Sequence, residues 1–104
     1  MLCEGAVRFM QQAMEAIRDN NPQTRYEKLT RTSEIVLALR TALDTSSQDR
    51  FAIELARVYQ SLDTRILSLH QTRDLGECAA VLEELRHVRD AWDAVAMTQS
   101  AAAV

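Results

Sequence analysis

Apolar residues recur every three or four positions through most of this chain. In the first twenty residues they fall on one stripe at about 100° of rotation per residue, and charged or amide side chains from Glu4 to Arg18 fall opposite. The stripe consists of Cys3, Ala6, Met10, Ala13, Met14 and Ile17. This period is typical of an amphipathic helix, and we predict one over residues 2–19.

The same period returns in three later segments, which predict helices over residues 23–43, 48–70 and 75–97. The apolar stripes are Leu29, Val36, Leu39 and Leu43 in the first of these, Phe51, Leu55, Val58, Tyr59, Leu62, Ile66 and Leu69 in the next, and Leu75, Cys78, Leu82, Leu85 and Trp92 in the last. Residues 98–104 end in AAAV, and we expect a frayed or disordered tail there.

Short polar stretches separate the four segments. They are DNNP at residues 19–22, DTSS at residues 44–47 and HQTRD at residues 70–74. Proline suits the first turn of a helix because its missing N–H would be unpaired there, so Pro22 marks a helix start. Ser46 or Ser47 is expected to cap the third helix, and Asp74 the fourth, with Glu77 completing a capping pair.

The composition favours a single all-α domain. The chain has 104 residues, of which 47% are hydrophobic, and it contains only two glycines and one proline, too few for the many turns of an all-β fold. Amphipathic helices joined by short connections pack as antiparallel neighbours. We therefore predict an antiparallel four-helix bundle over residues 1–97.

Charge and hydropathy exclude several classes of partner. The formal charge is −3 with no basic stripe, so a nucleic-acid partner is not expected. The sequence shows neither a signal peptide nor an apolar run of membrane-spanning length, which favours a cytoplasmic protein. Cys3 and Cys78 lie on apolar stripes, and we expect two buried thiols rather than a disulfide.

The candidates for metal binding and catalysis are weak. Glu84 and His87 have the spacing found in di-iron bundles, but that site needs the pair twice, and both residues lie off their apolar stripe. His70 is expected to lie at a helix C-terminus as a partly charged cap, and Arg89 to cover the bundle edge with its stem. We predict no metal, no cofactor and no enzymatic activity.

Five apolar residues lie off the stripes or at their edges: Leu37, Ile53, Leu67, Val81 and Val88. They are either scattered surface side chains, which soluble proteins carry in number, or the walls of a groove across the second, third and fourth helices. A groove of this kind binds an amphipathic partner helix. Periodicity alone leaves both interpretations open.

Four segments in order resemble the FliS family of flagellar secretion chaperones. They are MLCEGAVRFMQQAMEAI, SEIVLALRTALD, LARVYQSLDTRI and LEELRHVRDAW. Tyr59 and Arg65 match family positions in the third segment, and Trp92 matches in the fourth. The similarity covers nearly the whole chain without large gaps.

The resemblance implies a bundle that binds the disordered C-terminal segment of flagellin in hydrophobic grooves, prevents premature assembly and delivers the client to the export gate. The alternative is a structural or regulatory bundle that self-associates, for example as a homodimer, through the same off-stripe residues. The resemblance also implies that Gly5 lies inside the first helix where a neighbour approaches closely. No capping residue precedes Leu2, and we expect this helix to start upstream in the family.

Overall fold

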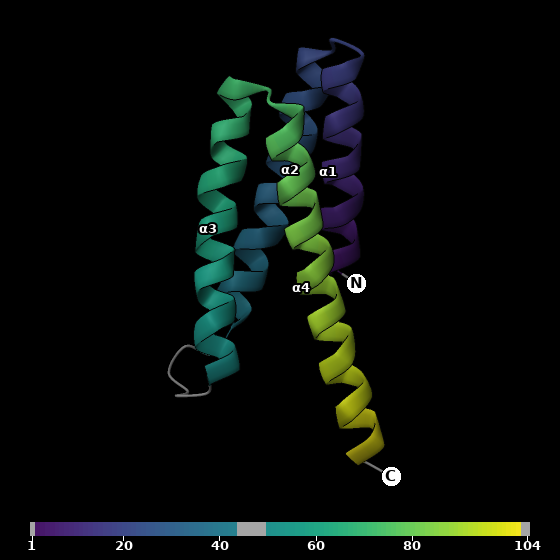
Figure 1. The fold of residues 1–104 in the computed structure, drawn as a ribbon, viewed down its shortest axis with the longest axis vertical. Helices are drawn as coiled ribbons and strands as arrows, with labels where there is room; N and C mark the ends of the chain where they lie inside the picture. Colours follow the sequence, from purple (N-terminus) through teal and green to yellow (C-terminus); the bar gives the residue numbers. More distant parts are fainter. Residues whose placement is uncertain (1, 44–49, 103–104) are drawn as a thin grey trace.

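Four helices make up the described part of this chain. The computed structural model describes residues 2–43 and 50–102, and from residue 96 onward only the backbone. The helices are α1 (Leu2–Arg18), α2 (Pro22–Ala42), α3 (Arg50–Thr72) and α4 (Leu75–Ala102). Each packs against two others, in the ring α1, α2, α3, α4, and successive helices run in opposite directions (Figure 1). The predicted all-α antiparallel four-helix bundle is confirmed.

The helix ends lie close to their predicted positions, except at the C-terminus. The first three helices start and end within two residues of the predicted bounds. Helix α4 continues to Ala102, past the predicted end at residue 97, because its last turns contain alanine and no helix-breaking residue. Ser46 and Ser47, the predicted caps of α3, lie outside the described residues.

Side-chain caps begin α2 and α4 at the same end of the bundle. The Asn21 side-chain oxygen accepts a hydrogen bond from the Thr24 backbone N–H at 3.1 Å, and Pro22 takes the first turn as predicted. The Asp74 carboxylate accepts from the N–H groups of Gly76 and Glu77, at 2.9 and 3.3 Å. These bonds satisfy N–H groups that have no partner within the helix.

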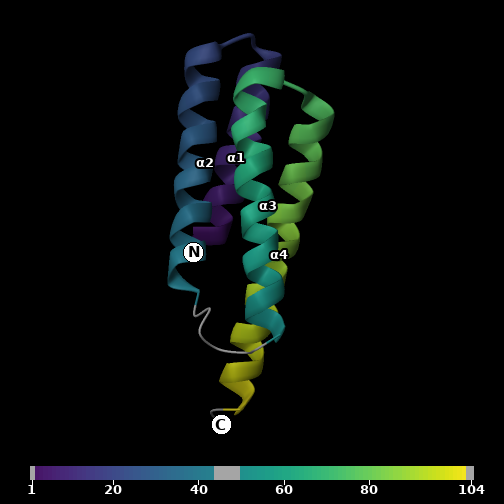
Figure 2. The same ribbon diagram turned by 90° about the vertical axis from the view of Figure 1, so that its left-hand side faces the viewer.

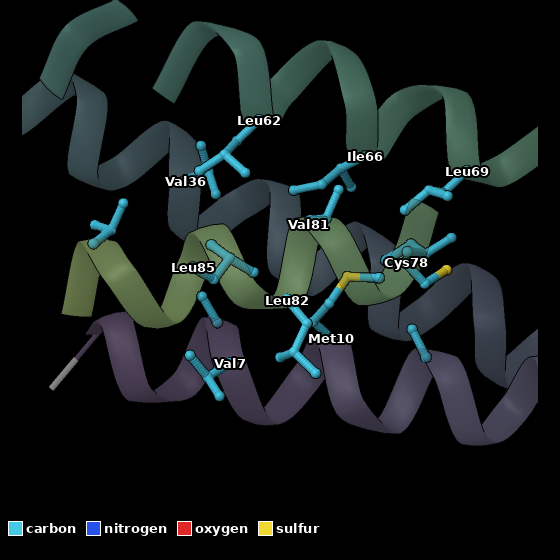
Figure 3. Packing of buried hydrophobic residues seen from close by; sticks show 14 of the residues in the cluster. Val7, Met10, Val36, Leu62, Ile66, Leu69, Cys78, Val81, Leu82 and Leu85 are labelled. Carbon is cyan, nitrogen blue, oxygen red and sulfur yellow. The ribbon is translucent and has the colours of Figure 1, made fainter. Parts of the chain in front are cut away.

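The core lies along the bundle axis and takes side chains from all four helices (Figure 3). Val7 and Met10 of α1, Val36 of α2 and Ile66 of α3 are among its fully or nearly fully buried members. The buried members of the predicted stripes are Cys3, Ala6, Met10, Ala13, Met14, Leu29, Val36, Leu55, Tyr59, Leu62, Ile66, Leu69, Cys78, Leu82 and Leu85. Periodicity therefore identified most of the core correctly.

Helix α4 buries a wider arc than its predicted stripe. Val81 is 0% exposed and Val88 4%, so the prediction that they lie on an outer groove is wrong. Both lie on the side of α4 that carries Glu77, which bonds to Arg65 of α3. That side of α4 faces α3. The apolar arc of α4 is therefore wide enough to pack against both α1 and α3. Leu75, placed on the stripe, is instead 36% exposed at the first residue of α4.

A short ion pair joins the ends of α3 and α4. Glu77, expected to complete a capping pair with Asp74, instead accepts a hydrogen bond from Arg65 Nε at 2.7 Å. Farther along the same two helices, Trp92 Nε1 donates to the Tyr59 hydroxyl oxygen at 2.7 Å. The Phe51 ring meets Trp92 edge to face, with centroids 5.7 Å apart. These contacts join α3 to α4 at both ends of their shared length.

Gly5 allows α1 and α2 to approach closely, as predicted. It is buried, and a Cβ atom built on it would lie 3.3 Å from Ile35 Cδ1 of α2. A larger side chain would displace Ile35 because protein cores are close-packed.

Both cysteines should be unreactive in the native protein. Cys3 and Cys78 are buried free thiols. Burial raises the pKa of both, that of Cys78 to about 11, so at pH 8 only about one Cys78 side chain in a thousand is the reactive thiolate. With Ellman's reagent at pH 8 we expect slow labelling of the folded chain and rapid labelling of both thiols in 6 M guanidinium. Rapid stoichiometric labelling without denaturant would contradict the burial.

Candidate functional site

Large apolar side chains are exposed at several places on the described surface. They are Leu2, Tyr26, Leu37, Ile53, Leu67 and Leu75. Four of them belong to the adjacent helices α2 and α3: Tyr26 is 61% exposed, Leu37 56%, Ile53 44% and Leu67 69%. Large apolar side chains do not stabilise the fold while they are exposed to water. Where several of them cluster on the surface, they mark an interaction site.

These four side chains lie along one line on the outside of the bundle. In α3, Ile53, Gln60 and Leu67 are seven residues apart, a spacing that returns to nearly the same side of a helix. In α2, Tyr26 and Leu37 are eleven residues apart and likewise share a side. The two helices lie beside each other and run antiparallel (Figure 2). We call this line, marked by Tyr26, Leu37, Ile53 and Leu67, the α2–α3 seam.

One end of the α2–α3 seam is hollowed into a groove of about 620 Å³. Its lining residues are Leu37, Arg40, Thr41 and Leu43 of α2 and Ile53, Ala56, Arg57 and Gln60 of α3. The volume is in the range of about 300–1,000 Å³ typical of ligand pockets. Gln60 lines the groove together with Ile53, and Leu67 follows on the same side of α3. The groove and the rest of the seam therefore share one side of α3.

Arginines border the groove, and only one has an acidic partner among the described residues. Arg40 Nη1 lies 3.3 Å from Asp63 Oδ2, a pair that crosses from α2 to α3. No described residue forms a hydrogen bond or an ion pair with Arg57. Arg50, about two turns before Arg57 in α3, is paired with Glu54 at 3.4 Å. Among its described lining residues, the groove thus combines apolar side chains with one arginine that has no acidic partner.

At the other end of the seam, Tyr26 packs against His70 of α3. Their ring centroids are 5.3 Å apart and the planes are tilted by 58°. Burial lowers the pKa of His70, and the nearby Arg25 charge lowers it further. His70 lies in the last turn of α3, as predicted, but these causes favour the neutral imidazole. The charged form expected for a histidine cap is therefore disfavoured.

Acidification should weaken the fold through His70. Because the pKa of His70 is lower in the folded chain than its ordinary value of 6.5, the unfolded chain binds this proton more readily. The stability contributed by the neutral His70 side chain is fully present above pH 6.5 and is lost as the pH falls through the pKa of His70 in the folded chain. We expect the urea concentration at the unfolding midpoint to decrease when the pH is lowered from 7 toward 5.5. In His70→Gln this decrease should be smaller. An equal fall in both proteins would assign the effect to other groups.

The structure separates the five predicted binding residues into two groups. Leu37, Ile53 and Leu67 lie exposed on the α2–α3 seam, whereas Val81 and Val88 are in the core. Tyr26 was not among the predicted residues, although its spacing from Leu37 was a usable signal. Arg57 was missed because an exposed arginine has no distinguishing sequence pattern.

The weaker chemical candidates lie on solvated surface. His87 is exposed, with its ring nitrogens 3.7 Å from oxygens of Glu83 and Glu84. Within residues 2–43 and 50–102, no group of three or more histidine, cysteine, aspartate or glutamate side chains could hold a metal ion. The Arg89 guanidinium bonds to Asp90 at 3.1 Å, as expected for an arginine at the bundle edge. No described helix is both long and apolar enough to cross a bilayer.

Comparison with known proteins assigns the family. The family model described as flagellar protein FliS matches residues 1–99 of this chain. The chain belongs to the FliS family. A curated relative, the flagellar secretion chaperone FliS of Vibrio cholerae, is 25% identical over 95 residues, which cover 91% of this chain and 70% of the relative. The resemblance found in the sequence is confirmed, and the coarse role that follows for this FliS family member is that of a flagellar secretion chaperone.

Proposed function

We propose that this chain binds the C-terminal segment of flagellin along the α2–α3 seam, in the cytoplasm, before export. The observation that carries the proposal is the alignment of Tyr26, Leu37, Ile53 and Leu67 on two adjacent helices of a FliS family member. Exposed apolar side chains in a row are suited to the apolar face of an amphipathic helix. The bundle core is complete without them, so they remain available to a client.

The dimensions of the seam suit a client helix of several turns. From Ile53 to Leu67 the α3 backbone rises about 21 Å, and from Tyr26 to Leu37 the α2 backbone rises about 16 Å, at 1.5 Å per residue. A client helix of about 15 to 18 residues covers this length. Its apolar positions, repeated every three or four residues, would pack between the four exposed side chains and into the groove beside Leu37 and Ile53.

Binding of this kind couples client folding to client protection. A disordered segment that becomes helical on the seam loses conformational entropy, which costs on the order of 2–5 kcal/mol of the gross interaction energy. Burial of apolar surface, at roughly 25 cal/mol per Å², offsets that cost. While bound, the apolar face of the client is withheld from other flagellin copies. Such a complex would prevent premature assembly and present the client to a component of the export gate.

The proposal is tested by titration with the C-terminal segment of the flagellin encoded in the same genome. Circular dichroism should show more helix in the mixture than in the sum of the separate components, and calorimetry should give a saturable 1:1 isotherm. A composition-matched scrambled segment serves as the control. If the native segment produces no heat and no gain of helix, the proposed function fails.

Self-association is the second candidate, and the same seam motivates it. A second copy of the chain would also cover Tyr26, Leu37, Ile53 and Leu67. Sedimentation velocity over a wide concentration range separates the two ideas. A client-binding chaperone is expected to sediment as a monomer that forms a complex with the segment, whereas a homodimer that the segment leaves intact would favour a structural or regulatory bundle.

A further inference from the structure

We infer that Arg57 makes the groove end of the α2–α3 seam selective for a partner helix that carries a carboxylate beside its apolar face. This inference rests on the proposed function, because it describes the partner that the same seam accepts. The groove supplies both parts of the recognition: apolar walls from Leu37, Leu43, Ile53 and Ala56, and a cation at the rim.

The charge balance of the groove is the first argument. Among the described residues, the groove is lined by two arginines and by no acidic side chain. Asp63 neutralises Arg40 from outside the lining, through the 3.3 Å contact. No described residue neutralises Arg57, and the nearby Glu54 is held by Arg50. Within the described lining, one positive charge is therefore left without an acidic partner, in a chain whose formal charge is −3.

The position of Arg57 is the second argument. It follows Ile53 by four residues in α3, so it lies one turn farther along the same part of the helix surface. A helix packed against Ile53 and Leu37 would cover the Arg57 guanidinium and remove part of its hydration. A covered arginine without a partner is unfavourable, whereas a carboxylate at its side forms a charge-assisted hydrogen bond. Partners without an acid at this register are thereby disfavoured.

Designed peptides test the inference without depending on any one flagellin. The probes are amphipathic 18-residue helices with leucines on one face, about 27 Å long, and a single glutamate near either the N-terminal or the C-terminal end. Each has a counterpart with glutamine in place of glutamate. We expect one of the two glutamate probes to bind about three- to tenfold more tightly than its glutamine counterpart, with a smaller ratio at 0.5 M NaCl.

A double-mutant cycle assigns the preference to the residue. In Arg57→Gln, the glutamate and glutamine probes should bind with equal affinity, and in Arg57→Glu the better probe should be one with lysine in place of glutamate. Arg31→Gln removes the same charge from α2, outside the groove lining, and should leave the ratio unchanged. Both positions, Arg57 and Arg31, are exposed in helices, so these three variants should fold, which circular dichroism verifies.

Each alternative result has a definite meaning. Equal binding of all four probes to the unmodified chain overturns the inference but leaves helix docking intact, and so does a glutamate preference that persists in Arg57→Gln. Absence of probe binding overturns the inference as well. The flagellin titration judges the proposed function separately. A dimer of the chain that no probe displaces would assign the seam to a second copy.

Discussion

Val81→Glu should leave the chain largely unfolded at 25 °C. Val81 is fully buried on the side of α4 that faces α3 and belongs to the hydrophobic core cluster, and the nearby Arg65 is already paired with Glu77. An unpaired charge in a core costs several kcal/mol, and a domain of this size has a free energy of unfolding of only about 5–15 kcal/mol. Far-ultraviolet circular dichroism should show lost helix. If some chains still fold, urea denaturation should give a free energy of unfolding lower by at least about 3 kcal/mol.

Leu67→Glu is the matched control for this prediction. It introduces the same charge on a neighbouring helix, but Leu67 is 69% exposed on the α2–α3 seam. Substitutions on exposed helix surface usually change stability by less than about 0.5 kcal/mol. Equal unfolding midpoints for Val81→Glu and the unmodified chain would mean that the Val81 side of α4 is not in the core.

The double variant Leu37→Glu with Leu67→Glu should lose client binding while keeping the fold. Each leucine, when covered by a client helix, contributes roughly 1.5–3 kcal/mol to the binding free energy. Two replacements should therefore raise the dissociation constant by about 100-fold or more. The two positions are 56% and 69% exposed, and glutamate is a good helix former. Calorimetry with the flagellin C-terminal segment measures the loss, and thermal denaturation measures the fold.

The control for the binding experiment is the double variant Ala38→Glu with Ser68→Glu. These residues are the chain neighbours of Leu37 and Leu67, they are exposed, and each lies about 100° around its helix from the seam residue. The variant makes the same change in net charge without removing an apolar contact. If both double variants bind the client alike, the α2–α3 seam is not the client site.

The separation of core and seam explains how one chain can be stable and still hold an apolar surface in water. The core is built from the inward sides of four helices, and the seam from side chains that lie about 90° or more around α2 and α3 from the middle of the buried side. Substitutions at the seam should therefore change binding, and substitutions in the core should change folding. The predictions for Val81 and for Leu37 with Leu67 test this separation from its two sides.

The sequence predicted that exposed apolar residues form a binding site, but it did not predict correctly which residues belong to that site. Leu37, Ile53 and Leu67 were correctly placed off the core stripes because they lie outside the arc that one packed neighbour would cover. Val81 and Val88 have the same appearance in sequence. They differ only because α3 lies against their side of α4, as the bond between Arg65 and Glu77 shows.

The helix ends were likewise predictable where local chemistry decides them. Pro22 and Asp74 mark the starts of α2 and α4 through groups within a few residues. The end of α4 at Ala102 was harder because alanine continues a helix without a stop signal. His70 was misjudged for a different reason: its pKa depends on burial and on Arg25, which is distant in the sequence.

The sequence by itself determined four amphipathic helices, their antiparallel order and the inward side of each, because apolar period and capping act over one or two helical turns. It also carried the likeness that identified the family. Only the tertiary structure decided which apolar residues stay in water and which of the two groove arginines has an acidic partner among the described residues. Those properties depend on the helix that lies alongside, and no spacing within one helix contains that information.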